Sequence, residues 1–296
     1  MPSQDNKMSL QHRRAHAIIL ALTVFRSCRC IRTSIGDRED KVIGWSEKYK
    51  DPDGSPSLHI EHLSWSPRSF LYGSFLTEDE CDHLIRLAKP HMKDATILDQ
   101  KTGKQIPNPL RQNKETHLEI GQDEVVNKIE FRISRYTFLP GYNGEPMHMM
   151  YTTPGHGYEA HTDWLEDWWH PQLGNERIAT IIMYLNDVLE GGETVFPNST
   201  AQPNKGDASF STCGQKGLSV KPKKGDALMF YNLLENGRTD GTSLHQGCPV
   251  IRGDKWTATK RILVNRAPNN DATGMFKKAI VSNMLLKGSN SGSKAA

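Results

Sequence analysis

The residues best suited to chemistry are two histidines and an aspartate. His161 and Asp163 stand two positions apart at the end of an extended run. Because residues i and i+2 of a strand point to the same face, the imidazole and the carboxylate are expected to converge on one point. His245 is the candidate for a third ligand. Two histidines and one carboxylate form the facial triad of non-haem Fe(II) oxygenases, so these residues indicate a metal site.

A lysine ten residues beyond His245 suggests a second role. Lys255 stands at the start of an expected strand, where a buried ammonium group suits the distal carboxylate of a dicarboxylate co-substrate. Most lysines are exposed, so on charge alone Lys255 could equally be a solvated surface residue. A His-x-Asp pair is also common by chance. The interpretation of the His-x-Asp pair and of Lys255 therefore depends on the segments around them.

Short extended runs separated by turns must position these residues. The expected strands are Met147–Tyr151, Tyr158–Trp164, Ile178–Asn186, Thr194–Phe196, Gly217–Pro222, Asp226–Tyr231, Ser243–His245 and Trp256–Val264. An earlier extended run covers 58–65, and helices are expected after an N-cap at Thr77 and over 124–136. The pattern predicts a mainly β fold with flanking α-helices, an antiparallel sandwich or jelly roll rather than a βαβ sheet.

Composition and charge narrow the class of protein. The chain has 296 residues, of which 36% are hydrophobic and 24% charged, as in a soluble globular protein. Its net charge of +3 comes from the ends, because residues 1–40 and 267–296 each contribute +3 and the middle about −3. A mildly acidic middle lacks the basic face that phosphate binding requires, so nucleic acid is not an expected partner.

The two ends are expected to be separate from the folded region. Residues 1–40 are expected to be a signal or anchor region, because the basic residues 12–14 precede a short apolar run, 15–25, that is too short to span a bilayer. The alternatives are a short buried helix and an apolar stretch that arises by chance in a disordered N-terminus. Residues 41–57 are expected to be a linker, 58–266 the catalytic domain and 267–296 a flexible tail. Membrane contact is expected only through the N-terminal segment.

The cysteines and one sequon bear on the compartment. Beyond the N-terminal region the chain has three cysteines and no Cys-x-x-Cys pair, which argues against a structural zinc module. At most one disulfide can form among them, and we favour Cys213 with Cys248. Asn198 begins the sole glycosylation sequon. These features agree with a place in the endoplasmic reticulum or Golgi lumen.

Several segments, in order, resemble the prolyl 4-hydroxylases of the plant and algal type. The matching segments are 64–68, 81–85, 161–163, 177–188, 190–197, 217–222, 225–228 and 243–256. Together they cover about residues 58–266. Many motifs in the right order are far more specific than any one of them.

The resemblance implies a double-stranded β-helix that binds Fe(II) and 2-oxoglutarate. His161, Asp163 and His245 match the iron ligands of that family, and Lys255 matches the lysine that holds the 2-oxoglutarate carboxylate. Three protein ligands leave three iron positions, two for the 2-oxo acid and one for O2. Ascorbate is expected as the reductant.

The resemblance also assigns residues around the site. Tyr151 and Thr180 match positions that line the 2-oxoglutarate pocket, and Tyr158 and Arg177 match positions near the peptide substrate. Trp164 begins an aromatic-rich segment that could form an edge for a proline-rich peptide in polyproline II form, with loop packing as the alternative.

The chain also departs from the family pattern. One extra residue is expected between Tyr151 and His161, Thr162 replaces the usual aromatic between the ligands, and Gln246 replaces a usual glycine. Arg261 stands where the last strand usually has tryptophan. None of these departures removes a ligand, so they bear on substrate preference more than on activity.

The expected function is hydroxylation of peptidyl proline to 4-hydroxyproline in proline-rich proteins of the secretory pathway, by a monomer. The same chemistry on free proline or another amino acid stays open, because a fold does not fix function. A catalytically idle β-sandwich that binds peptide or sugar is a second alternative, and it would not need Lys255. A metal-dependent hydrolase is a third, but it needs a positioned general base that no motif supplies.

Overall fold

A computed structural model describes residues 46–49, 58–98, 105–107, 113–165 and 176–265. Its helices are α2 (Glu78–Ala88) and α3 (Glu124–Thr137), with short 3-10 turns η2 (Lys89–His91), η3 (Gly141–Asn143), η4 (Gly214–Lys216) and η5 (Gly241–Ser243). The predicted signal region and C-terminal tail lie outside these residues. Among the described residues, no helix is both long enough and apolar enough to cross a membrane.

Two antiparallel sheets form the body of the fold. The larger sheet has the order β1 (Ser46–Tyr49), β2 (Leu58–Trp65), β3 (Arg68–Gly73), β14 (Ala227–Tyr231), β10 (Arg177–Tyr184), β17 (Lys255–Leu263), β8 (Met147–Thr152), β7 (Lys114–Leu118) and β4 (Lys93–Asp94). The smaller sheet has the order β13 (Leu218–Val220), β12 (Thr194–Phe196), β15 (His245–Gly247) and β9 (Tyr158–His161). Two further pairs join β11 (Glu190–Gly191) to β16 (Val250–Arg252) and β5 (Thr96–Leu98) to β6 (Gln105–Pro107).

The helices form where the sequence supplies caps. The Thr77 side chain accepts from the Glu80 backbone N–H, and the Glu80 carboxylate accepts from that of Thr77, which is a complete capping box. Asp123 caps α3 by accepting from the Val126 N–H. Both predicted helices are therefore confirmed: α2 begins directly after the expected N-cap, and α3 ends one residue beyond the expected end.

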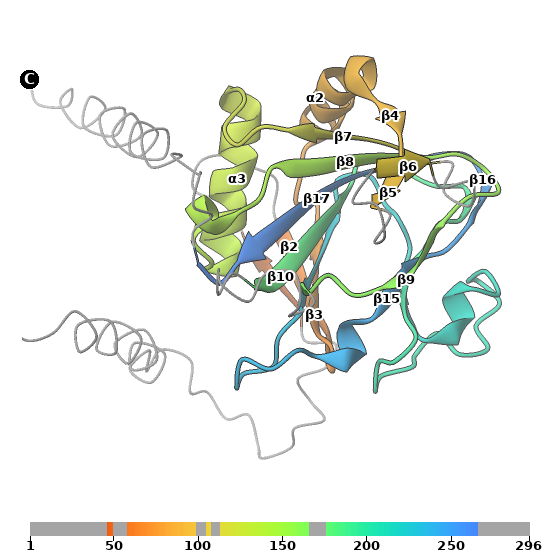
Figure 1. Cartoon of the computed structure of the whole chain (residues 1–296). Helices are drawn as coiled ribbons and strands as arrows, with labels where there is room; N and C mark the ends of the chain where they lie inside the picture. The colour runs from red at the N-terminus through yellow and green to blue at the C-terminus, as the bar shows by residue number, and fades with distance from the viewer. Residues whose placement is uncertain (1–45, 50–57, 99–104, 108–112, 166–175, 266–296) are drawn as a thin grey trace, which may run out of the picture. The chain divides into compact units, whose positions relative to one another are not determined.

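The two helices and the smaller sheet lie on opposite faces of the larger sheet (Figure 1). Because side chains alternate along a strand, Ala258 and Ile262 of β17 pack in the helix-side core. Residues 255, 257, 259 and 261 of the same strand face the other way and line a cavity. A second core, which includes Tyr184, Phe196 and Phe230, fills part of the space between the sheets. The double-stranded β-helix expected from the sequence is confirmed.

The structure differs from the expected elements at several places, and the strands β3, β4, β5, β6, β11 and β16 were not expected. Residues 46–49, expected within a linker, form β1 and pair with β2. Strand β7 was not expected, and its sequence, Lys-Glu-Thr-His-Leu, lacks an apolar alternation. Ser243 lies in η5 rather than in a strand, because the Asp240 side chain accepts from the Thr242 N–H and holds a tight turn there. The strand β15 begins only at His245.

Candidate metal centre and cavity

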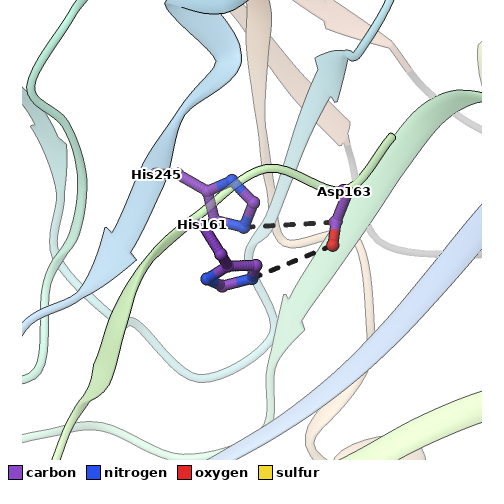
Figure 2. A group of neighbouring side chains, drawn as sticks. All are labelled: His161, Asp163 and His245. Atoms are coloured by element: carbon purple, nitrogen blue, oxygen red, sulfur yellow. Dashed lines mark ion pairs between the residues drawn. The ribbon is translucent and has the colours of Figure 1, made fainter. Parts of the chain in front are cut away.

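Strand pairing brings the second histidine to the first. His161 ends β9 and His245 begins β15, and the two stand directly opposite each other in the antiparallel β9–β15 pair. Asp163 follows β9 by two residues. Figure 2 shows the three side chains pointing toward a common point, and their candidate ligand atoms all lie within 4.8 Å of one another.

The hydrogen bonds of the two imidazoles leave one nitrogen of each free for a metal. Nδ1 of His161 lies 2.8 Å from the Glu159 carbonyl oxygen, and Nδ1 of His245 lies 3.0 Å from that of Ser243. A carbonyl oxygen can only accept, so each Nδ1 carries the proton and each Nε2 keeps its lone pair. Nε2 of His161 is buried without a hydrogen-bond partner. Such an orphaned acceptor, aimed at a carboxylate, fits a metal ligand.

The protonation states of the three groups also fit a divalent metal. Burial and the neighbouring His245 lower the pKa of His161 to about 3, and burial lowers the pKa of His245. Burial alone would raise the pKa of Asp163, but the Arg261 guanidinium beside it holds that pKa well below its usual range. Two neutral imidazoles and one carboxylate are the donor set typical of non-haem Fe(II).

Asp163 is held by its neighbours on both oxygens. The Thr180 hydroxyl donates to Oδ2 at 2.7 Å, and Thr180 in turn accepts from the Asn232 side-chain amide at 3.1 Å. Arg261 Nε donates to Oδ1 at 3.1 Å. Oδ1 lies 3.8 Å from Nε2 of His161, and Oδ2 lies 4.0 Å from Nε2 of His245. The carboxylate thus faces both imidazoles in a fixed orientation.

The three residues open into a cavity that Lys255 also lines. Lys255 is 8% exposed, and its ammonium group donates to the Gly192 carbonyl oxygen at 2.6 Å. Burial lowers the pKa of Lys255 to about 8, against the opposing effect of Glu193. Within the described part of the chain, no carboxylate forms an ion pair with it. A buried cation in the same cavity as the candidate metal ligands therefore suits an anionic ligand from outside the protein.

Comparisons with known proteins agree with this geometry. The profile of the 2OG-Fe(II) oxygenase superfamily matches residues 147–262. Probable prolyl 4-hydroxylase 8 of Arabidopsis thaliana is 46% identical over 233 residues, which cover 77% of this chain and 75% of the relative. Prolyl 4-hydroxylase 5 of the same plant is 46% identical over 214 residues, or 71% and 73% of the two chains. The chain belongs to the prolyl 4-hydroxylase family.

A solved structure supports the same family. The viral collagen prolyl hydroxylase of Paramecium bursaria Chlorella virus-1, in its 2-oxoglutarate complex, superposes with a TM-score of 0.50 and 25% identity. The match covers 67% of this chain and 96% of the viral one. This prolyl 4-hydroxylase family member therefore shares its core with an enzyme of known 2-oxoglutarate binding.

Two residues expected in the 2-oxoglutarate pocket, Tyr151 and Thr180, are not among those that line the cavity. Tyr151 packs against Trp256, with ring centroids 4.7 Å apart, and does not line the cavity. Thr152, one residue later, faces the cavity and pairs with Lys255 across β8 and β17. Thr180 acts on Asp163 through its hydroxyl and does not line the cavity either.

Of the residues expected near the peptide, the structure places some on the cavity and others away from it. Tyr158 lines the cavity and stacks on His161, with ring centroids 3.9 Å apart. Arg177 donates to both carboxylate oxygens of Glu145, at 2.7 and 3.0 Å, and to the Asp163 carbonyl oxygen at 3.2 Å. Trp164 is half-buried and does not line the cavity. The rest of its aromatic-rich segment, 166–170, lies outside the described residues.

The predicted disulfide is present beside the cavity. Cys213 and Cys248 are bonded to each other, and Cys248 lines the cavity. The bond ties the η4 loop to the segment that follows β15. Sequence reasoning missed Asn232, Glu145 and the acid-facing role of Arg261, because their contacts join segments far apart in the chain.

Proposed function

We propose that this chain hydroxylates peptidyl proline at C4 in proline-rich protein segments, using Fe(II), 2-oxoglutarate and O2 and releasing succinate and CO2. The observation that carries the proposal is one cavity lined by both the His161–Asp163–His245 cluster and the buried cation Lys255. The names of the plant relatives and of the viral structure support proline as the target.

The residues of the cavity divide the work of binding. When bound, Fe(II) and 2-oxoglutarate supply the O2 activation and oxygen transfer. His161, His245 and Asp163 offer two lone pairs and one carboxylate to the metal. Lys255 binds the distal carboxylate of 2-oxoglutarate by an ion pair in a buried site, where such a pair is little screened. The protein therefore mainly supplies orientation.

Tyr158 and Arg177 are proposed to receive the peptide. The Tyr158 ring lines the cavity directly above His161 in a stacked contact, so an apolar pyrrolidine ring could pack on it. Glu145 holds the Arg177 guanidinium beside the Asp163 backbone, where its fixed donors suit a peptide carbonyl. An extended polyproline II segment offers both groups.

The compartment, reductant and assembly are proposals of the same kind. We infer that the protein acts as a monomer in the endoplasmic reticulum or Golgi lumen, with ascorbate as reductant. The short apolar segment 15–25 and the Cys213–Cys248 bond support an oxidising secretory compartment. Asn198 is exposed, as a glycosylated asparagine must be.

The test measures succinate release and peptide mass in one reaction. The protein is incubated with Fe(II), 2-oxoglutarate and ascorbate, with and without a proline-rich peptide, beside His161→Ala and Lys255→Ala. Peptide-stimulated succinate with a gain of about 16 Da on proline, lost in both variants, supports the proposal. Succinate without a peptide shift would reject this substrate but keep the oxygenase. No succinate from the wild type would favour a binding module.

A further inference from the structure

Asp163 has a neighbour that the facial triad by itself does not require. Arg261 lies on the cavity face of β17 and donates through Nε to Asp163 Oδ1 at 3.1 Å. Both side chains are largely buried, with 13% and 3% of their surfaces exposed. The bond from Thr180 occupies the other oxygen, Oδ2. Each oxygen of the carboxylate therefore has its own donor.

Arg261 is in turn held from its far side. Its Nη1 lies 3.5 Å from Nδ1 of His148, and Nε2 of His148 lies 3.0 Å from the Glu115 carboxylate. An arginine can only donate, so Nδ1 of His148 accepts and its Nε2 carries the proton toward Glu115. The chain Glu115–His148–Arg261–Asp163 thus runs from β7 through β8 and β17 to the metal centre, with each donor facing an acceptor.

We propose that Arg261 is a positioning residue that fixes the rotation of the Asp163 carboxylate against the two imidazoles, and that it thereby strengthens metal binding. The inference rests on the metal site proposed above. Arginine suits the role because its planar donor fork has a fixed geometry.

Arg261 has two opposing effects on metal affinity. The direction in which the affinity changes when Arg261 is replaced therefore tests the inference. Its positive charge lies beside a ligand and repels a divalent cation, so by charge alone its removal would strengthen metal binding. Its hydrogen bond orients the ligand, so by position its removal would weaken metal binding. Loss of a group that orients a metal ligand typically costs about 10- to 100-fold in affinity. We expect the positioning effect to dominate because Asp163 is buried and its two oxygens are separately held.

The experiment is a calorimetric titration of the metal-free protein with Ni²⁺, which is stable to oxidation. The wild type should bind one ion, and His161→Ala should abolish binding. Arg261→Gln should weaken binding about 10-fold or more. The matched control is Arg252→Gln, which removes the same charge from an exposed side chain of β16 and should leave the affinity unchanged. Absorption spectra with Co²⁺ should change for Arg261→Gln and not for Arg252→Gln.

The outcomes separate this inference from the proposed function. Failure of the wild type to bind Ni²⁺ would overturn the metal site itself. Wild-type binding with an equal or tighter affinity in Arg261→Gln would overturn the positioning role alone. If Arg261→Gln does not fold, by its melting curve without metal, Arg261→Lys takes its place. It keeps the charge but loses the Nε donor, so weakened binding is expected, and wild-type affinity would overturn the inference.

Discussion

Lys255 is buried, and burial lowers the pH up to which its ammonium group stays charged. This sets an upper pH limit for binding of the 2-oxoglutarate carboxylate. The pKa of Lys255 is lowered to about 8, so the ammonium form predominates below that pH and is lost above it. The KM for 2-oxoglutarate should therefore be flat below pH 8 and rise about tenfold per pH unit above it. Steady-state kinetics between pH 6.5 and 9.5 measure this directly.

The control for this pH effect is Lys255→Ala. It should show a much higher KM for 2-oxoglutarate that no longer changes between pH 8 and 9.5, because no ammonium group is left to titrate. A KM that rises equally in wild type and Lys255→Ala would assign the pH dependence to another group. A flat wild-type KM would mean that Lys255 stays charged or does not bind the carboxylate.

Variants of Thr152 and Tyr151 test which face of β8 contacts 2-oxoglutarate. Thr152 lines the cavity, whereas Tyr151 packs on Trp256 in the helix-side core. Thr152→Val removes one hydroxyl and should raise the KM for 2-oxoglutarate about 2- to 10-fold, the worth of one hydrogen bond. Tyr151→Phe should leave that KM unchanged. The reverse pattern in the measured KM values would restore the assignment of Tyr151 to the pocket.

At the scale of elements, β17 joins the helices to the site. On its helix-side face Lys260 forms a fully buried ion pair with Glu130 of α3, while Arg261 on its other face contacts Asp163. Lys260→Met would leave the Glu130 carboxylate buried and unpaired, so it should lower the free energy of unfolding by about 3–5 kcal/mol. Urea unfolding followed by circular dichroism measures the change.

The double variant Glu130→Gln/Lys260→Met provides the control for that prediction. It removes both charges, so much of the lost stability should return, because the cost arises mainly from an unpaired buried charge. The introduced glutamine amide would still face the Gly121 N–H that now binds the Glu130 carboxylate. If the single and double variants are equally unstable, packing of the lysine stem matters more than its charge.

Sequence patterns among neighbouring residues predicted the secondary-structure elements well. The site residues that these patterns missed are held by contacts between segments far apart in the chain. The cap at Thr77 and the i, i+2 spacing of His161 and Asp163 depend only on neighbouring residues, so the sequence reveals them. The Thr152 position was missed because a slip of one residue reverses the face of every side chain in a strand. The bond from Arg261 to Asp163 and the bond from Asn232 to Thr180 depend on strand order, which no local pattern encodes.

At the scale of the whole molecule, the Cys213–Cys248 bond links stability to the compartment. It closes a loop of 35 residues, and one end lies three residues after His245. Loop-closure entropy predicts that the bond stabilises the fold by about 3–4 kcal/mol. The variant Cys213→Ser/Cys248→Ser should therefore be less stable by that amount in urea unfolding, and so should the wild type in dithiothreitol.

The comparison of oxidised and reduced protein decides whether this bond matters for function. Dithiothreitol should not change the stability of the double serine variant, because its one cysteine among the described residues, Cys81, is buried and unbonded. Since Cys248 lines the cavity, we also expect reduced wild type to bind Ni²⁺ more weakly than oxidised protein. Equal stability and equal affinity in both states would show that the chain works as well in a reducing compartment, and would remove the disulfide as support for a secretory location.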